Sequence, residues 1–245
     1  NPTDEEWGAT TIRAGGQYDL TADSTVYLSY SEGYKAGGVG QYECTPAFDP
    51  EEVEAYEIGY KASFLDGRTH LSGAVFFYDY VGFQVTQALD LGTATRNAGD
   101  AEVKGVEIEF TSSVGENWTV NASATLLDSE YKDFINFDGL RPELGFQQLK
   151  GNSLSNAPET SINLGLAYSF AQFGGLVTLR VDSAYRSRTY FREFNGKDDS
   201  QDAYTIVNLN ATWESDDQDW TARLFAKNVT DEEYAQTIFG SGASG

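Results

Sequence analysis

The chain has 245 residues with 38 acidic and 16 basic side chains, and its formal net charge of -22 at pH 7 argues against a nucleic-acid partner, which needs a positive surface. Hydrophobic residues make up 40% of the chain, yet no stretch approaches the roughly 18 uninterrupted apolar residues of a membrane-spanning helix. A helical membrane protein is therefore excluded, whereas a soluble β domain and a membrane β-barrel both remain open.

Apolar side chains alternate with small or polar ones in about ten segments, and this period of two predicts two-faced β-strands. The second face carries charges such as Glu107, Arg180 and Asp182, which would be costly in a dry core, so we expect that face to be wet or polar. The segment 71–80 is apolar on both faces, and its orientation stays open. The segments are 12–20, 26–31, 56–64, 71–80, 105–110, 120–126, 162–170, 177–185, 207–213 and 221–227.

The connections between these segments alternate between short and long. A soluble sandwich and a transmembrane barrel give the same strand alternation, but loops above about 12 to 15 residues are uncommon in compact domains. Outer-membrane barrels have short periplasmic turns and long extracellular loops, so the rhythm predicts an all-β, antiparallel transmembrane β-barrel. The short connections are 21–24, 65–67, 115–117, 171–174 and 215–219; the long ones are 33–52, 81–100, 129–158 and 187–202.

Aromatic residues lie beside the short turns, where the interfacial girdle of a barrel belongs. Packing in the core of a soluble sandwich is the alternative explanation. These residues are Phe64, Phe110, Trp118, Phe170, Trp213 and Trp220.

Several short motifs occur in an order that resembles the C-terminal half of the β-barrel of TonB-dependent receptors. They are 30–38 (YSEGYKAGG), 50–61 (PEEVEAYEIGYK), 97–99 (NAG) with 105–107 (GVE), 151–152 (GN) with Pro158 and Ser161, 204–209 (YTIVNL) and 225–234 (FAKNVTDEEY). No single motif is decisive, but together they cover nearly all of the chain.

The resemblance implies an outer-membrane protein of a Gram-negative bacterium. Barrels of the family have 22 strands, so we expect residues 1–245 to be a partial barrel domain of about ten strands, without the plug domain and the last strand. The resemblance further implies active uptake of a scarce nutrient, such as a ferric siderophore, haem, cobalamin or a carbohydrate. Implied partners are TonB, through the missing N-terminal part, the nutrient cargo, and outer-membrane lipid with lipopolysaccharide.

Candidate cargo contacts are Tyr34, Lys35, Arg188, Tyr190 and Arg192, which are expected near strand ends or in the long loops. There a ligand would meet cations, rings and hydrogen-bond donors together. A loop-packing role is the alternative for each of them. Arg188 and Arg192 suit a ferric siderophore and lipopolysaccharide phosphates equally well.

Other function classes have weaker support. A barrel enzyme would need a general base, and the only histidine, His70, has no nucleophile recognisable beside it. The lone Cys44 and the acidic groups 198–202 and 216–219 match no defined metal motif, so neither a metal site nor a cofactor is predicted. A passive porin-like channel and a secreted β-rich adhesin share the alternation and remain the alternatives to a receptor.

Overall fold

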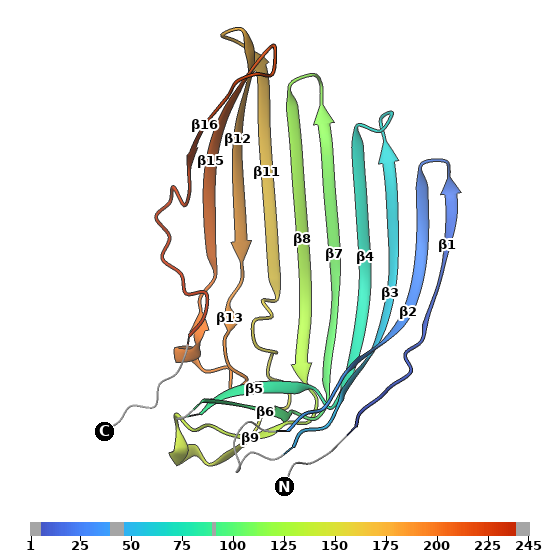
Figure 1. The fold of residues 1–245 in the computed structure, drawn as a ribbon, viewed down its shortest axis with the longest axis vertical. Coiled ribbons are helices and arrows are strands. Elements are labelled where there is room, and N and C mark those ends of the chain that lie inside the picture. Colours follow the sequence, from blue (N-terminus) through green and yellow to red (C-terminus); the bar gives the residue numbers. More distant parts are fainter. Residues whose placement is uncertain (1–5, 40–46, 90–91, 239–245) are drawn as a thin grey trace.

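The computed structural model describes residues 6–39, 47–89 and 92–238, and nearly all of its regular structure is β. Ten antiparallel strands form one sheet that curves into an open trough (Figure 1). Its edge strands β1 and β16 do not pair with each other within the described residues, so the sheet does not close on itself. In sheet order the strands are β1 (Arg13–Thr21), β2 (Ser24–Lys35), β3 (Glu51–Phe64), β4 (Thr69–Val81), β7 (Ala101–Val114), β8 (Trp118–Tyr131), β11 (Thr160–Ala171), β12 (Gly175–Arg186), β15 (Tyr204–Ser215) and β16 (Thr221–Ala226).

The ten predicted strands are confirmed, and their pairing continues the apolar face from strand to strand. Ile58 lies opposite Val75, which in turn lies opposite Val106. Residues opposite each other in a ladder share a face, so these side chains belong to one outer belt. Ile58 and Val75 are 57% and 53% exposed, which is the exposure expected of a surface that faces lipid instead of a protein core.

The register also settles the orientation of β4, which the sequence left open. Because Val75 shares the outer belt with Ile58, the neighbouring Phe76 and Tyr78 face the concave side. Their rings stack at 5.0 Å, and Phe76 lies opposite Gly105, where an added Cβ would come within 2.6 Å of its ring. A glycine on the adjacent strand thus makes room for an inward aromatic ring, and Phe76 is only 6% exposed.

The predicted rhythm of connections is confirmed, with all long connections at one end of the sheet and all short turns at the other (Figure 1). Three long connections that the sequence suggested as loops contain small antiparallel pairs of their own. One of these, β5–β6, runs across the long-loop end of the sheet (Figure 1). The additional elements are β5 (Gln84–Leu89), β6 (Gly92–Asn97), β9 (Ile135–Phe137), η1 (Pro142–Leu144), β10 (Phe146–Gln148), β13 (Thr189–Tyr190), η2 (Lys197–Asp199) and β14 (Ser200–Gln201).

The aromatic residues predicted beside the short turns lie there, and those on strands belong to the outer face. Trp118 and Tyr168 are cross-strand partners with ring centroids 4.6 Å apart, and Tyr168 stacks on Phe170 at 5.6 Å. Trp213 lies opposite Val177 in the same outer row. Trp220 lies in the last short turn and is 72% exposed.

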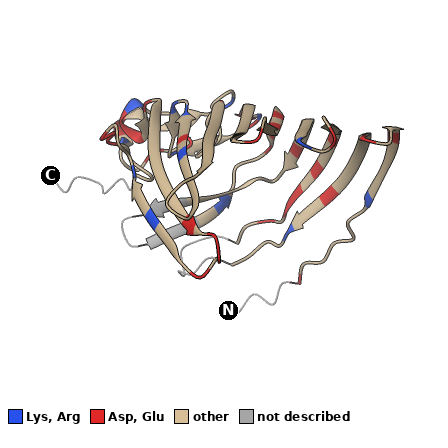
Figure 2. Cartoon of the chain, turned by 90° about the horizontal axis from the view of Figure 1, so that it is seen from above, with Lys and Arg blue, Asp and Glu red and all other residues tan. Residues whose placement is uncertain are grey.

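A row of acidic side chains crosses five strands on the outer face near the long-loop end. Each is the direct cross-strand partner of the next. Among the described residues, Lys104 forms ion pairs with Glu102 and Asp128, and Lys132 forms ion pairs with Glu102 and Glu130. Acidic bands on several strands are visible in Figure 2. The row consists of Glu32, Glu54, Asp79, Glu102 and Glu130.

The buried core of the described chain is small and lies at the long-loop end, not along the sheet. Tyr131 and Ala101 contribute from the ends of β8 and β7, and Tyr80 and Phe83 pack against them. The loops supply the remaining buried members, which are Ala98, Phe134, Leu149 and Leu154. None of the described helical segments is long and apolar enough to cross a membrane.

Candidate functional site

Two of the predicted contact residues end strand β2. Tyr34 lies opposite Glu52 and Lys35 opposite Glu51, so the two side chains leave the sheet on opposite faces. The hydroxyl oxygen of Tyr34 is buried and has no hydrogen-bond partner within the described ranges. Strands β3, β4, β7, β8 and β11 separate β2 from β12 in the sheet, so the structure does not bring this pair next to the other three candidates.

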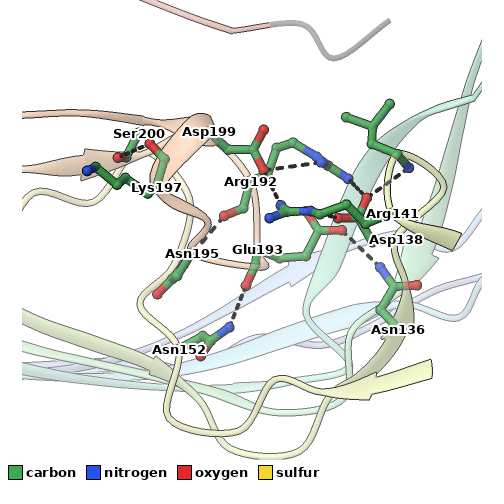
Figure 3. A network of polar contacts seen from close by, with 11 residues as sticks. Asn136, Asp138, Arg141, Asn152, Arg192, Glu193, Asn195, Lys197, Asp199 and Ser200 are labelled. Carbon is green, nitrogen blue, oxygen red and sulfur yellow. Dashed lines mark hydrogen bonds and ion pairs between the residues drawn. The ribbon is translucent and has the colours of Figure 1, made fainter. Parts of the chain in front are cut away.

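The other three candidates share the connection between β12 and β15. Arg188 donates to Asp202 at 2.6 Å, and both side chains are more than half exposed. Tyr190 lies in β13, where its carbonyl accepts from the amide of Asn156 at 2.8 Å. Arg192 points the other way, into a buried network of polar groups (Figure 3).

Two aspartates and two arginines form the centre of this network, and we refer to Asp138, Arg141, Arg192 and Asp199 as the charge quartet. Asp138 is fully buried and accepts from Arg192 at 2.6 Å and from Arg141 at 2.8 Å. Asp199 accepts from the same two arginines, at 2.8 Å from Arg141 and 3.2 Å from Arg192. Each arginine thus bridges both carboxylates, and the quartet joins the loop after β8 to the loop after β12.

Amide and carboxylate groups extend the connection between the same two loops. Asn136 donates to the Glu193 carboxylate at 2.9 Å, and Asn152 donates to the Glu193 backbone carbonyl at 2.9 Å. Asn195 accepts from the amide of Ser153 at 2.8 Å and donates to its carbonyl at 3.0 Å. Buried polar groups are stable only when they are hydrogen-bonded, and this set meets that condition by spanning both loops.

The arginines and aspartates of the quartet shift one another's pKa values, as Asp138 and Arg141 show. Burial by itself raises the pKa of Asp138, but hydrogen bonds from Arg192, Arg141 and the Leu140 amide outweigh it and hold that pKa below its usual value. The pKa of Arg141 is raised, chiefly by its hydrogen bond with Asp138. Asp138 and Arg141 are therefore both charged at neutral pH. Arg192 also lies over the Phe194 ring at 5.0 Å, which links the quartet to the small apolar core.

Sequence reasoning identified Arg192 but missed Asp138 and Arg141. The available signal was the rarity of arginine in loops dominated by acids, combined with the i,i+3 spacing of Asp138 and Arg141. In the acidic group 198–202, Asp199 and Asp202 are occupied by the arginine pairs described above. Asp217, in the other acidic group, accepts from Ser215 at 2.5 Å.

The concave wall of the sheet carries a second polar cluster. Arg180 donates to Asp182 at 2.6 Å and to Asn121 at 3.1 Å, and Asn163 donates to Ser123 at 3.1 Å. These residues line an open hollow of about 430 Å³. The wall is polar here, as the charges on the second face predicted.

The structure also places the residue types that could serve metal binding or catalysis. No group of three or more His, Cys, Asp or Glu side chains suited to a metal ion occurs within residues 6–39, 47–89 and 92–238. His70 lies on β4, opposite Ser63 on one side and Thr111 on the other. Cys44 lies outside the described residues.

Comparison with known proteins gives a consistent pattern. Residues 1–229 match a family model described as TonB dependent receptor-like, beta-barrel. A ferric-pyoverdine 358 receptor of Pseudomonas putida is 28% identical over 241 residues, covering 96% of this chain and 27% of the relative. A probable TonB-dependent siderophore receptor, PiuA, of Acinetobacter baumannii is 28% identical over 191 residues, covering 74% of this chain and 25% of the relative.

Solved structures show the same fold. The ferric yersiniabactin uptake receptor FyuA from Yersinia pestis superposes with a TM-score of 0.76 at 21% identity, covering 94% of this chain and 34% of that one. The siderophore receptor PiuA from Acinetobacter baumannii superposes with a TM-score of 0.74 at 22% identity, covering 91% and 32%. The chain thus spans about a quarter of the curated relatives and about a third of the solved structures.

Proposed function

The chain belongs to the TonB-dependent receptors, outer-membrane proteins of Gram-negative bacteria, and we propose that it supplies barrel wall and extracellular loops to a receptor for active uptake of a ferric siderophore. The family assignment and the predicted antiparallel barrel class are confirmed. The observation that carries the proposal is the family match over all ten strands of the sheet.

Ferric siderophores are the proposed cargo because the relatives named above are siderophore or ferric-pyoverdine receptors. The long-loop end is then the extracellular end, and it holds Arg188, Tyr190 and Arg192 on one connection. We retain these three, with Tyr34 and Lys35, as candidate cargo contacts. Since Arg192 already bridges two aspartates, its proposed role is to fix the loop that presents Tyr190, whereas the exposed Arg188 is available to an anionic group.

The remaining parts of the receptor are also proposals. Residues 1–245 form part of the barrel domain, while the plug domain and the segment that binds TonB belong to other parts of the whole protein. The outer belt faces lipid, and the strand ends above it face lipopolysaccharide. The family consists of transport receptors, and we propose no catalytic role and no resident metal or cofactor.

Uptake of ⁵⁵Fe tests the proposal directly. The complete receptor is expressed in a strain that lacks its own siderophore receptors, in TonB-positive and TonB-negative versions, and supplied with a panel of ferric siderophores. Active transport predicts accumulation of at least one chelate in the TonB-positive strain only. A passive porin-like channel would admit the chelates equally in both strains, and an adhesin would give no receptor-dependent accumulation in either.

A further inference from the structure

The alternation of the strands does not fix how neighbouring hairpins of the sheet are aligned. Short turns join the ten strands into five hairpins, and long connections join one hairpin to the next. A slip of one residue would exchange the two faces of a strand, but a slip of two residues keeps both faces as they are. A tight turn sets the register within a hairpin, whereas a long connection leaves the register between hairpins open. The long connections are 36–50, 82–100, 132–159 and 187–203.

Three of the four pairings between hairpins contain a glycine that is covered by an aromatic ring of the partner strand. The glycine has no side chain, and the ring occupies the space where a Cβ would be. An added Cβ would come within 2.6 Å of the Phe76 ring or 2.7 Å of the Trp213 indole nitrogen, and it would overlap the Tyr27 ring. The pairs are Gly59 under Tyr27, Gly105 under Phe76 and Gly175 under Trp213, and we call them the glycine sockets.

The fourth pairing between hairpins, β8 with β11, is crossed by an arginine instead of a ring. Gly165 of β11 lies opposite Asn121 of β8. The guanidinium group of Arg180, which comes from β12, lies over Gly165 and donates to Asn121 at 3.1 Å. Every pairing between hairpins in the described sheet therefore has a large side chain seated over a glycine.

The first socket shows how a register is recognised. The Tyr27 hydroxyl donates to Glu57 at 2.7 Å, and the Lys61 ammonium lies 5.4 Å from the centre of the Tyr27 ring. Glu57 and Lys61 are the neighbours of Gly59 on the same face of β3, one on each side. After a slip of two residues the ring would face one of these long side chains instead of the glycine. The hydrogen bond and the cation–π contact would both be displaced.

We propose that the glycine sockets set the register between hairpins that long connections join. A slip of two residues would place Phe76 against Val103 or Glu107 in the second socket, as it places Tyr27 against a long side chain in the first. Overpacking of this kind is destabilising, so each socket penalises a slip that alternation tolerates. The inference goes beyond the uptake function, because it concerns the alignment of the wall whatever the receptor carries.

Cross-strand disulfides in the complete receptor report the register directly. Glu32 and Glu54 lie opposite each other in β2 and β3, so Glu32→Cys with Glu54→Cys reports the native register. Glu32→Cys with Tyr56→Cys reports a slip of two residues, because diagonal neighbours in the native register are too far apart for a disulfide. Both reporters are made in a Cys44→Ser background and oxidised after the receptor has been refolded into lipid vesicles.

Gly59→Ala places a methyl group in the first socket. The matched control is Gly73→Ala, which makes the same change on β4, where the nearest atoms lie at ordinary contact distances of 3.4 and 3.9 Å. We expect G59A to raise the ratio of slipped to native disulfide about tenfold, and G73A to leave it at the wild-type value. Adding Tyr27→Ala to G59A removes the displaced ring and should return the ratio to that of Tyr27→Ala alone.

Three results would overturn the inference. Equal ratios in wild type and G59A would show that Gly59 does not set the register, and an equal rise in G73A would show that any strand glycine has this effect. A rise in G59A that persists without the Tyr27 ring would place the cause in the backbone.

A failure of G59A to fold also gives a decision. If this variant yields no heat-modifiable barrel, recovery of the barrel in the double variant G59A/Y27A would support the socket, and continued failure would overturn it. The measurements use no cargo, so the uptake function stands or falls separately.

Discussion

Replacing Asp138 by asparagine tests whether the charge quartet holds the two extracellular loops together. The substitution keeps the size of the side chain and removes the negative charge that both arginines share. Removing one partner of a buried ion pair typically destabilises by about 3 to 5 kcal/mol. Because Asp199 still accepts from Arg141 and Arg192, we expect about 2 to 3 kcal/mol here.

The effect should be local, since the quartet lies outside the ten-stranded sheet. A loss of 2 to 3 kcal/mol corresponds to roughly 30- to 140-fold faster opening-limited hydrogen exchange. Exchange is measured by mass spectrometry on the complete receptor, on peptides covering residues 132–152 and 188–200. Peptides from β11 and β12 serve as the internal reference and should keep their wild-type rates.

The matched control is Asp202→Asn, which removes the carboxylate that pairs with Arg188. That pair is more than half exposed on both sides, and surface ion pairs contribute little, so loop exchange should stay near wild type. If D138N left the loop peptides unchanged, or if D138N and D202N accelerated them equally, burial of the quartet would not be what fastens the loops. The reasoning would then be wrong.

Three further predictions concern the acidic row, pH and one loop glycine. Asp79→Lys should stabilise the complete barrel by about 0.5 kcal/mol, because Asp79 lies between Glu54 and Glu102 and like charges opposite each other destabilise a sheet. The temperature at which the folded barrel loses its heat-modifiable migration on a gel measures this stabilisation. The pKa of Asp138 is lower in the folded protein than its usual value. The stability that its carboxylate contributes is therefore present at pH values above the unfolded pKa of about 3.9, and it is lost as the pH falls through the folded pKa. Hydrogen exchange of the loop peptides, corrected for intrinsic rates, should be the same at pH 7 and pH 5 and should accelerate near pH 3. Gly99→Ala should destabilise the long loops by about 1 to 3 kcal/mol, because the residue has φ +77° and a Cβ would overlap the Asp133 carbonyl oxygen. The urea concentration at which the loop peptides of the complete receptor lose protection from hydrogen exchange measures this loss.

Each of these has a control or a contradicting result. Glu116→Lys makes the same change of charge in a short turn, outside the strand pairings, and should not raise the migration temperature. Accelerated exchange already at pH 5 would contradict the assigned direction of the Asp138 pKa. Gly67→Ala carries the same backbone strain at φ +82° with open space around the new methyl group, so equal losses at positions 67 and 99 would refute the clash argument.

The sheet was predictable from the sequence because each strand carries its own alternation. The ten segments, their short turns and the aromatic residues beside them follow from residues a few positions apart. β4 was the exception, since inward positions that are polar elsewhere carry Phe76 and Tyr78 there. The Phe76 ring finds its room opposite Gly105 on the neighbouring strand, and that pairing becomes visible only once the register is known.

The charge quartet was not predictable in the same way. Asp138 and Arg192 are 54 positions apart, and no local period connects them. Arg192 looked like a ligand contact because arginine is rare in an acidic chain, and the same rarity is what suits it to bridge two buried aspartates. The β9–β10 hairpin, which buries Asn136 and exposes Phe137 and Phe146, was hidden for a related reason, because Asn136 bonds Glu193 on another loop.

The arrangement of the core suggests why loops and sheet can vary separately in such a receptor. A sheet with lipid on one face and a wet wall on the other has no apolar interior on which its long loops could rest. The loops therefore form their own small core around Tyr131 and Leu149 and fasten it with the quartet. Since these contacts lie mostly within the loops, substitutions that reshape the β9–β10 hairpin leave the strand register untouched. The loops can then change in sequence without new barrel architecture, as expected where a rigid scaffold carries variable loops.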